Sequence, residues 1–319
     1  MLVRRDVPWT WTLYYAWPSL LYFLAVATTV YILRRVIHRF DLTIPFEPVV
    51  IMSTALAIFL GFKNNQAYGR WWEARIIWGL AVNYSRAWSR QVLSLIEAPA
   101  EEREELRALQ RQLIRRHLAF MHALRVHLRS TDSFPQEDSP DEPVVAHNNY
   151  ADCLHYLDEK EYQALLRADN PPESLLQAQG QSLREARARG WLTEYVLVQL
   201  DQTLVELNHV QGRSERIKLT PLARPYSYFQ RLLVHVHGTM LPLAFVTSTG
   251  WLMIPLSVTV SFVFLSLDLI GSRIEDPFEN RADDTPLSSL TRTIERNLLE
   301  TLGEKPLPPR MQPEHGVLL

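Results

Sequence analysis

The sequence predicts an all-α protein, one part of which spans a membrane while the other forms a soluble helical body. Three observations lead to this prediction. Residues 7–33 and 232–267 contain no Asp, Glu, Lys or Arg, and Glu47 is the sole charged residue in 42–62. A helix needs roughly 20 predominantly apolar residues to cross a bilayer. Residues 63–224, in contrast, are polar with helical periodicity, and no segment alternates as a strand does.

The composition limits the classes of function. The chain has 319 residues, with 33 basic and 35 acidic side chains and a formal net charge of −2. A nucleic-acid-binding protein needs a clustered basic surface, so a near-neutral chain argues against that class. The single cysteine, Cys153, excludes an intramolecular disulfide and a zinc site built from several cysteines. The sequence has no phosphate-binding glycine loop, nucleophile elbow or metalloprotease motif, so an enzyme is the weaker class.

Four segments are predicted to cross the membrane as helices. The first, residues 19–33, follows a stretch rich in Trp and Tyr, whose amphipathic rings favour the lipid headgroup layer. The second covers residues 44–62. Residues 228–247 and 251–270 are expected to form a helical hairpin with its turn at residues 249–251. The partner that these segments imply is a lipid bilayer.

The polar part of the chain is predicted to be a helical body. In residues 101–129, leucines recur at helical spacing and Arg and Glu occupy the other faces. Residues 131–147 are acidic and lack periodicity, which is typical of a flexible loop. The Pro-rich tail, residues 306–319, is expected to be disordered or to lie over a neighbouring chain. Further helices are expected at 156–168, 172–188, 191–211 and from Leu287 to Leu298.

These segments divide the chain into four parts. Residues 1–62 hold an interfacial segment and the first two crossings, and residues 63–227 form the cytosolic helical region. Residues 228–270 form the last two crossings. Residues 271–319 form a cytosolic acidic segment, a helix and the tail.

Basic residues near the ends of the crossings predict which side each loop occupies, because cytoplasmic loops carry an excess of Lys and Arg. Two crossings return the chain to its starting side, so both termini and the helical body are placed in the cytoplasm, below an inner cell membrane. Arg34, Arg35 and Arg39 disagree, since they fall in the outer loop of this arrangement. The residues that favour it are Arg4, Arg5, Lys63, Arg70 and Arg75.

The second crossing carries a stripe of three residues. Thr54, Ile58 and Phe62 are four residues apart, so they share one side of a helix and drift by about 40° per step. One interpretation is that the stripe packs against a neighbouring helix. The other is that it faces a symmetry axis and lines a hydrophobic constriction, which can block ions by dewetting.

Four ordered motifs resemble the bestrophin family in its bacterial branch. The motifs are IFLGFKNNQAYGRWWEAR at 58–75, IKLTPLARPYSY at 217–228, LPLAFVTSTGW at 241–251 and IEDPFEN at 274–280. The resemblance touches all four predicted crossings and covers most of residues 1–300. Residues 97–190 show no distinctive match.

The resemblance implies a homopentameric ion channel with one central pore. In the family, the second crossing lines a narrow neck through three residues at i, i+4 and i+8, which correspond here to Thr54, Ile58 and Phe62. Thr54 departs from the family's pattern, because the bacterial branch usually has an aliphatic residue there. The family also has a cytosolic constriction, whose position by spacing falls near Tyr195, although no motif marks it.

The identity of the permeant ion stays open at this level. The resemblance favours chloride, while some bacterial relatives in the family pass monovalent cations such as sodium and potassium. A non-conducting membrane scaffold, with the stripe serving subunit contacts alone, is a further alternative. Charges near the two mouths are ambiguous. Asp41 and Glu47 would attract cations, whereas anions would be attracted by Arg34, Arg35, Arg39 and Lys63.

An acidic stretch follows the fourth crossing. Oxygen-rich clusters suit calcium, and eukaryotic bestrophins hold a gating calcium in the corresponding acidic segment. If calcium binds here, Asn280, Asp283 and Asp284 are the expected ligands. The alternative is an exposed, helix-capping loop without metal.

Histidines form no convincing metal site in the sequence. His117, His122 and His127 are five residues apart, so successive side chains rotate by about 140° and do not converge from one straight helix. We expect them at a solvent or subunit surface. His235 and His237 lie within the third predicted crossing, where a packing role is favoured over a role in an ion pathway.

Overall fold

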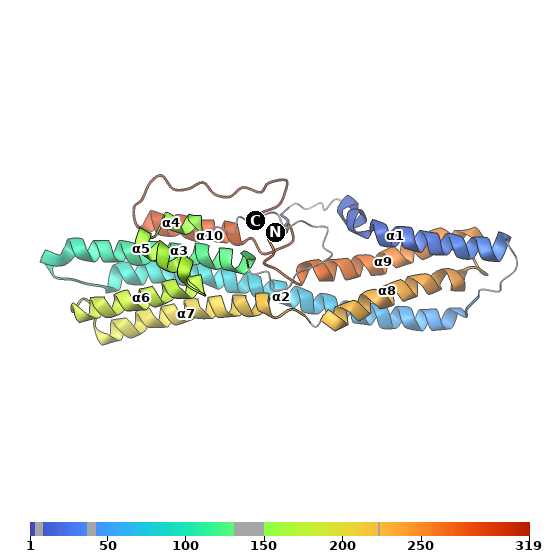
Figure 1. Ribbon diagram of the computed structural model, residues 1–319, viewed down its shortest axis with the longest axis horizontal. Coiled ribbons are helices and arrows are strands. Elements are labelled where there is room, and N and C mark those ends of the chain that lie inside the picture. Colours follow the sequence, from blue (N-terminus) through green and yellow to red (C-terminus); the bar gives the residue numbers. More distant parts are fainter. Residues whose placement is uncertain (4–8, 37–42, 131–149, 223) are drawn as a thin grey trace. The chain divides into compact units, whose positions relative to one another are not determined.

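The computed structural model describes every residue except 4–8, 37–42, 131–149 and 223 (Figure 1). The described part is helical, with no strand and just isolated β-bridges near the two ends of the chain, which confirms the all-α class. Arg4, Arg5, Arg39, Asp41 and the predicted loop at 131–147 lie outside the described residues. The longer helices are α1 Trp9–Tyr31, α2 Phe46–Leu95, α3 Arg103–Ser130, α5 Glu159–Arg167, α6 Pro171–Ala188, α7 Glu194–Leu219, α8 Arg224–Phe245, α9 Met253–Ile274 and α10 Leu287–Thr301. The short ones are η1 Ile32–Val36, η2 Ala100–Glu102, α4 Ala151–Leu154 and η3 Gly250–Leu252.

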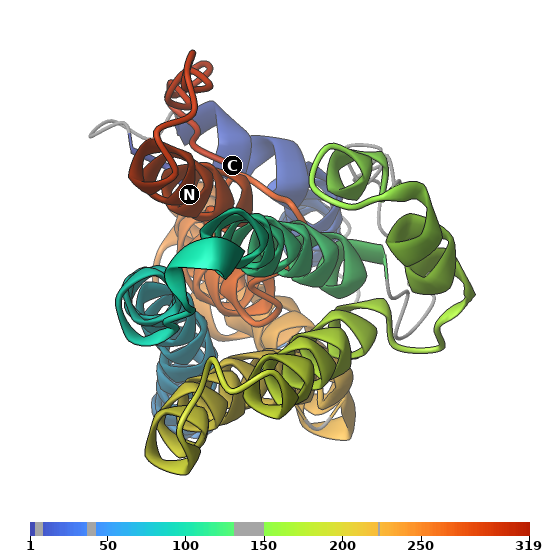
Figure 2. The ribbon, with the colours of Figure 1, turned by 90° about the vertical axis from the view of Figure 1, so that its left-hand side faces the viewer.

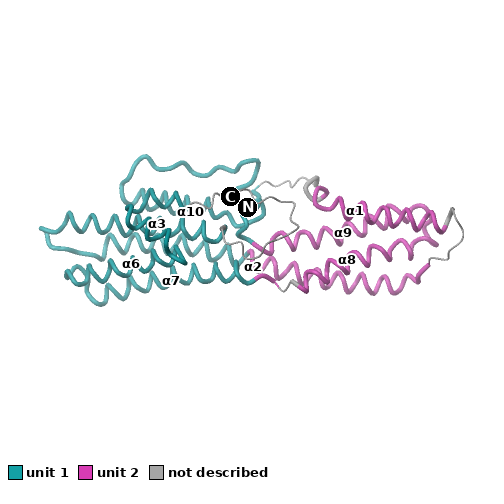
Figure 3. Tube along the Cα trace, viewed as in Figure 1, with its two compact units in different colours: residues 1–3, 72–220, 277–319 teal, residues 4–71, 221–276 magenta. Residues whose placement is uncertain are grey.

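The chain forms two compact units (Figure 3). Unit 1 contains residues 1–3, 72–220 and 277–319, and unit 2 contains residues 4–71 and 221–276. Helix α2 contributes to both, because it continues without interruption through the polar run that follows Phe62. The sequence pattern predicted a crossing at 44–62 and did not predict that the same helix runs on to Leu95.

Unit 2 packs α1, the N-terminal part of α2, α8 and α9 together. Its core contains Phe23, Leu56, Leu60, Val234 and Leu265, one or two from each helix. Helices α1 and α8 approach closely because Gly238 has no side chain: a Cβ there would lie 2.4 Å from Cε1 of Phe23. Small residues at such positions let membrane helices pack at short range.

Three helical segments are long and apolar enough to cross a membrane: Leu13–Arg34, Phe46–Leu95 and Gly250–Ile274. They include the predicted first, second and fourth crossings. Helix α8, which holds the predicted third crossing, falls short of this apolarity because it carries polar residues such as Gln230, Arg231 and His235.

Unit 1 is a helical bundle around α3. Helix α10 lies on one side of α3, and α6 followed by α7 lies on the other (Figures 1 and 2). Trp78 and Trp88 are fully buried in the core, and Nε1 of Trp88 donates to the Leu113 carbonyl at 3.4 Å. The helices begin where short polar side chains cap them: Asp158, Asn170 and Thr193 each accept a hydrogen bond from a backbone N–H three residues on.

The C-terminal tail does not behave as expected. It pairs with the first residues of the same chain in unit 1, where the Met1 amine donates to the Leu318 carbonyl at 2.5 Å and Val3 N donates to Gly316 O at 2.9 Å. The backbone N–H of Ser289, on α10, donates to Leu319 O at 2.8 Å. These backbone bonds satisfy groups that a disordered tail would leave to water, so the predicted disorder is wrong. The alternative, that the tail lies over a neighbouring chain, stays a prediction.

The prediction that the α3 histidines lie at a surface is wrong for two of them. His117 is 1% exposed and contacts Ser85 at 2.8 Å, while His122 is 6% exposed and stacks on Tyr156. His127 is half-buried and its Nε2 lies 3.5 Å from Glu215. A helix at the centre of a bundle buries most of its faces, so these side chains become core residues with separate partners.

Candidate pore-lining face of helix α2

The apolar half of α2 has two distinct faces in unit 2. The packed face consists of five residues that are each at most 1% exposed: Val49, Leu56, Leu60, Lys63 and Ala67. From Leu56 onward they are three or four positions apart. Residues two positions from a packed residue lie about 200° around the helix. The opposite face carries the predicted stripe: Thr54 is exposed, Ile58 is 55% exposed and Phe62 is 60% exposed.

The stripe offers no strong ligand for an ion. Ile58 and Phe62 have no polar side-chain atoms, and Oγ1 of Thr54 donates its hydrogen bond to the Val50 carbonyl at 3.0 Å. The Thr54 hydroxyl therefore turns oxygen lone pairs, and no free hydrogen, toward its surroundings. A ring of such side chains would strip water from an ion without replacing it, which is the condition for a hydrophobic constriction.

Polar contacts fix α2 against α8 and α9 at three positions along the helix. Oγ of Ser53, the residue before Thr54, lies 2.6 Å from Nε2 of His237. The backbone carbonyl of Phe59, the residue after Ile58, accepts from Nε2 of Gln230 at 2.7 Å. Lys63, the residue after Phe62, reaches α9. Each stripe residue is thus adjacent in sequence to a residue fixed against α8 or α9.

The third of these contacts is a buried ion pair between Lys63 and Asp268. Nζ of Lys63 donates to Asp268 Oδ1 and to Ser272 Oγ, both at 2.8 Å. Lys63 and Asp268 are each 1% exposed, and Nε of Arg231 lies 3.8 Å from Asp268 Oδ2. The prediction that Lys63 attracts anions at a pore mouth is wrong, because its charge is buried and paired. The sequence signal for this pair was Asp268, the one charged residue in the predicted crossing at 251–270.

On the C-terminal side of the ion pair, α2 and α9 approach each other closely. A Cβ at Gly271 would lie 2.1 Å from Oδ1 of Asn64. Nε of Arg70 donates to the Glu275 carbonyl at 2.9 Å, and its Nη2 lies 3.6 Å from Asp276 Oδ1. Burial, followed by the neighbouring charge of Asp276, raises the pKa of Glu275. Arg70 therefore joins α2 to the segment after α9.

The predicted cytosolic constriction residue lies in unit 1. Tyr195 occupies the first turn of α7 and is 90% exposed, and Val198, one turn further, is 68% exposed. Both side chains project from the bundle without burying their apolar surface within unit 1.

The acidic segment is more ordered than a solvent-exposed loop. Asn280 has a left-handed backbone with φ of 64°, and Asp284 is 2% exposed, with Oδ2 accepting from the Arg281 N–H at 3.0 Å. Burial raises the pKa of Asp284 to about 7. Oδ1 of Asn280 and Oδ1 of Asp284 are buried without a hydrogen-bond partner, whereas Asp283 is half-buried. Within the residues that the structure describes, no three His, Cys, Asp or Glu side chains are grouped to hold a metal ion.

The apolar helices and the comparisons with known proteins indicate a membrane channel rather than an enzyme. The family described as "Bacterial/Fungal Bestrophin protein" matches residues 12–300, and the chain belongs to this family. The chain is 32% identical over 267 residues to the voltage-dependent anion channel-forming protein YneE of Escherichia coli, covering 84% of this chain and 80% of the relative. It is 30% identical over 317 residues to the voltage-dependent anion channel-forming protein RSc3414 of Ralstonia nicotianae, with 96% of each chain covered.

A solved structure agrees with this assignment. The crystal structure of a bacterial bestrophin homolog from Klebsiella pneumoniae superimposes with a TM-score of 0.78 at 30% sequence identity, covering 90% of this chain and 98% of that one. The resemblance drawn from four short motifs is thereby confirmed over nearly the whole chain.

Proposed function

We propose that the protein is a bestrophin-type channel that conducts anions along an axis surrounded by copies of α2. The observation that carries the proposal is the division of α2 into a packed face and an exposed apolar stripe of Thr54, Ile58 and Phe62. The relatives named as anion channel-forming proteins support the anion assignment.

The proposed channel is a homopentamer. The four helices of unit 2 in one chain are too few to enclose a water-filled path. A ring of α2 helices from several chains can enclose such a path. The proposed number of five subunits rests on the resemblance to the bestrophin family. In the ring, the neck would be formed by Thr54, Ile58 and Phe62, and Tyr195 would form a second constriction from α7, where its 90% exposure leaves it available to face an axis.

We further propose four membrane crossings, including α8. Residues 1–3, 72–220 and 277–319 belong to one compact unit, so they lie on one side of a membrane. Between residues 220 and 277 the chain must then cross an even number of times. Because α9 is apolar enough to cross, α8 supplies the return crossing. Its buried His237 contacts Ser53, and its Arg231, although 63% exposed, lies 3.8 Å from Asp268.

The basic residues that follow the second crossing support placing unit 1 on the cytoplasmic side of an inner cell membrane. Arg70 and Arg75 follow the second crossing closely, and basic residues at the ends of crossings favour the cytoplasmic side. The same arrangement would place both termini in the cytoplasm.

A cation channel on the same scaffold is the second candidate, and one observation favours it. The Thr54 hydroxyl donates to Val50 O, so a ring of five would present oxygen lone pairs, which suit cations. The proposal is tested with protein reconstituted into liposomes and planar bilayers under asymmetric salt. A reversal potential near the equilibrium potential of chloride supports the anion channel. One near the equilibrium potential of potassium or sodium supports the cation channel. A bilayer that passes no current would contradict both and favour a non-conducting membrane scaffold.

Calcium is proposed as a ligand of the acidic segment. The two orphaned buried oxygens, Oδ1 of Asn280 and Oδ1 of Asp284, fit a hard cation, and Asp283 would supply a further carboxylate. Bound there, the ion would neutralise charge next to α10. Titration of the reconstituted current against a chelator tests this, since indifference of the current would contradict it.

A further inference from the structure

A strongly basic pocket lies in unit 1, apart from the α2 stripe. It has a volume of about 310 Å³ and is formed by α2, α10 and the C-terminal tail. Four arginines line it, namely Arg86 from α2, Arg292 and Arg296 from α10, and Arg310 from the tail. None of the lining residues is acidic. We call this cavity the four-arginine pocket.

The arginines of this pocket are poorly neutralised. Arg292 has a carboxylate partner, Glu295, at 3.0 Å, but Glu295 is buried and also accepts from the Tyr156 hydroxyl. Arg296 donates to a backbone carbonyl, that of Pro308. Among the residues that the structure describes, Arg86 and Arg310 have no hydrogen-bond or ion-pair partner, and both are exposed.

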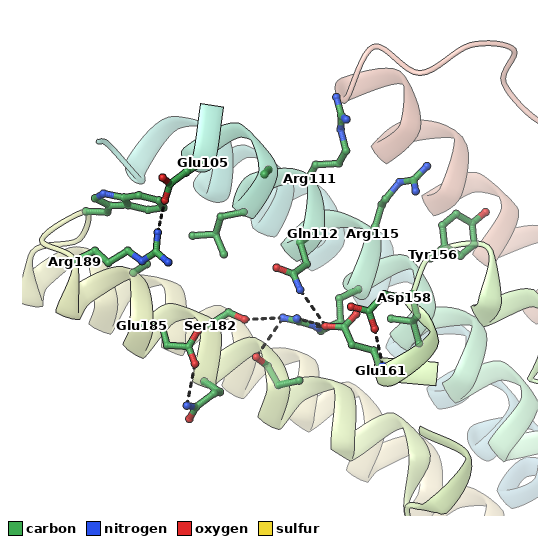
Figure 4. A pocket seen from close by; sticks show the side chains of 18 residues that line it. Glu105, Arg111, Gln112, Arg115, Tyr156, Asp158, Glu161, Ser182, Glu185 and Arg189 are labelled. Atoms are coloured by element: carbon green, nitrogen blue, oxygen red, sulfur yellow. Dashed lines mark hydrogen bonds and ion pairs between the residues drawn. The ribbon is translucent and has the colours of Figure 1, made fainter. Parts of the chain in front are cut away.

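A larger cavity of unit 1 shows the opposite arrangement. It measures about 880 Å³ and lies between α3, α5 and α6. There, Arg189 pairs with Glu105 at 2.6 Å and Arg116 pairs with Glu161 (Figure 4). Because internal carboxylates neutralise these arginines, that cavity needs no anionic ligand. The four-arginine pocket has no such supply of negative charge.

The donor pattern of the four-arginine pocket indicates the ligand. Guanidinium groups donate hydrogen bonds and accept none. Nδ2 of Asn297, another lining residue, is buried without an acceptor. A complementary ligand must therefore supply several acceptor oxygens and several negative charges. Phosphate oxygens match the planar fork of arginine in two-point hydrogen bonds.

We propose that the four-arginine pocket binds a multiply charged phosphate compound, with a diphosphate or a phosphate monoester as the recognised group. A single halide would leave most of the cavity empty and could contact few of the four guanidinium groups. The ligand would join the tail, through Arg310, to α2 and α10. Its source is either a soluble compound, such as a nucleoside diphosphate, or the headgroup of a phospholipid with a terminal phosphate.

The test is isothermal titration of inorganic pyrophosphate into the full-length protein in detergent at fixed ionic strength. The double variant R86Q/R310Q removes the two unpaired charges. Its matched control R90Q/K305Q removes two exposed charges outside the pocket, one from the same helix and one from the residue just before the tail. We expect saturable binding that weakens at least tenfold in R86Q/R310Q and less than twofold in R90Q/K305Q.

Two results would overturn the proposal: no saturable binding at millimolar pyrophosphate, or equal weakening in both double variants, which would mark a net-charge effect. Thermal unfolding without ligand checks that both variants fold. A repeat in lipid nanodiscs with and without phosphatidic acid separates the sources. Loss of pyrophosphate binding in the presence of phosphatidic acid supports the lipid headgroup, and unchanged binding supports the soluble compound.

Discussion

Lys63 on α2 and Asp268 on α9 form a fully buried ion pair, with Nζ and Oδ1 2.8 Å apart. The pair lies one residue beyond Phe62, so it fixes the end of the stripe against the helix behind it. Removing one partner of a buried pair leaves an uncompensated charge, which costs about 3–5 kcal/mol.

Asp268→Asn is therefore expected to lower the melting temperature of the detergent-solubilised protein strongly. Asp201→Asn, at an exposed position on α7, is the matched control and should leave it unchanged. The double variant K63M/D268L, which removes both charges, should recover a large part of the loss. If the double variant were as unstable as Asp268→Asn, the charge itself would not be the cause.

Ile58→Ala and Phe62→Ala are expected to increase single-channel conductance severalfold, because each widens an apolar ring and lowers the cost of wetting it. Ile270→Ala is the matched control, since Ile270 is 52% exposed on α9, close to the 55% of Ile58, but is not on the stripe. Planar-bilayer recordings compare the three. Equal currents in all of them would remove the stripe from the pore.

Gly271→Ala is expected to destabilise the packing of α2 on α9 by about 1–3 kcal/mol, because the new methyl group would overlap Asn64. Gly69→Ala is the contrasting substitution: nothing lies within 4 Å of its Cβ position, and alanine gains up to about 1 kcal/mol of helix propensity. The two melting temperatures should therefore move in opposite directions. A shared direction would contradict the close approach at Gly271.

His117 predicts an acid-sensitive unit 1. Burial lowers the pKa of His117 from 6.5 to about 3, so the unfolded chain binds a proton below pH 6.5 while the folded protein does not. The stability from this residue is fully present above pH 6.5 and is lost as the pH falls toward 3. Between pH 6.5 and 5 the expected loss is about 2 kcal/mol.

The check is the melting temperature as a function of pH. His117→Gln should flatten the profile between pH 7 and 5, because glutamine keeps a donor for Ser85 but does not titrate. His209→Gln, whose side chain is 55% exposed, should leave the slope as it is. An unchanged slope in His117→Gln would assign the acid sensitivity elsewhere.

Periodicity and apolarity in the sequence were sufficient to predict most of the helices, because α3, α6 and α10 have clear amphipathic spacing. The same signals misplaced His117 as a surface residue, since five-residue spacing shows the relative direction of side chains but not how many neighbours surround the helix. Position along α2 was also informative: the three stripe residues are all exposed, as an outward-facing stripe requires. Their place around an axis stays a prediction.

The residues behind the stripe could not be predicted in the same way. Lys63 and Asp268 are 205 positions apart, and a pairing over that distance depends on how α2 and α9 pack. The same holds for Ser53 with His237. The tail was misjudged for a related reason: its partners are backbone groups at the other end of the chain, which composition does not reveal.

The residues that fasten α2 in place and the residues that it turns outward are different members of the same helix. Substitutions at Thr54, Ile58 and Phe62 can therefore alter width, wettability or charge without disturbing the joints at Ser53, Phe59 and Lys63. In the proposed pore, these three positions form an interchangeable lining, through which permeation can be tuned while the scaffold stays constant.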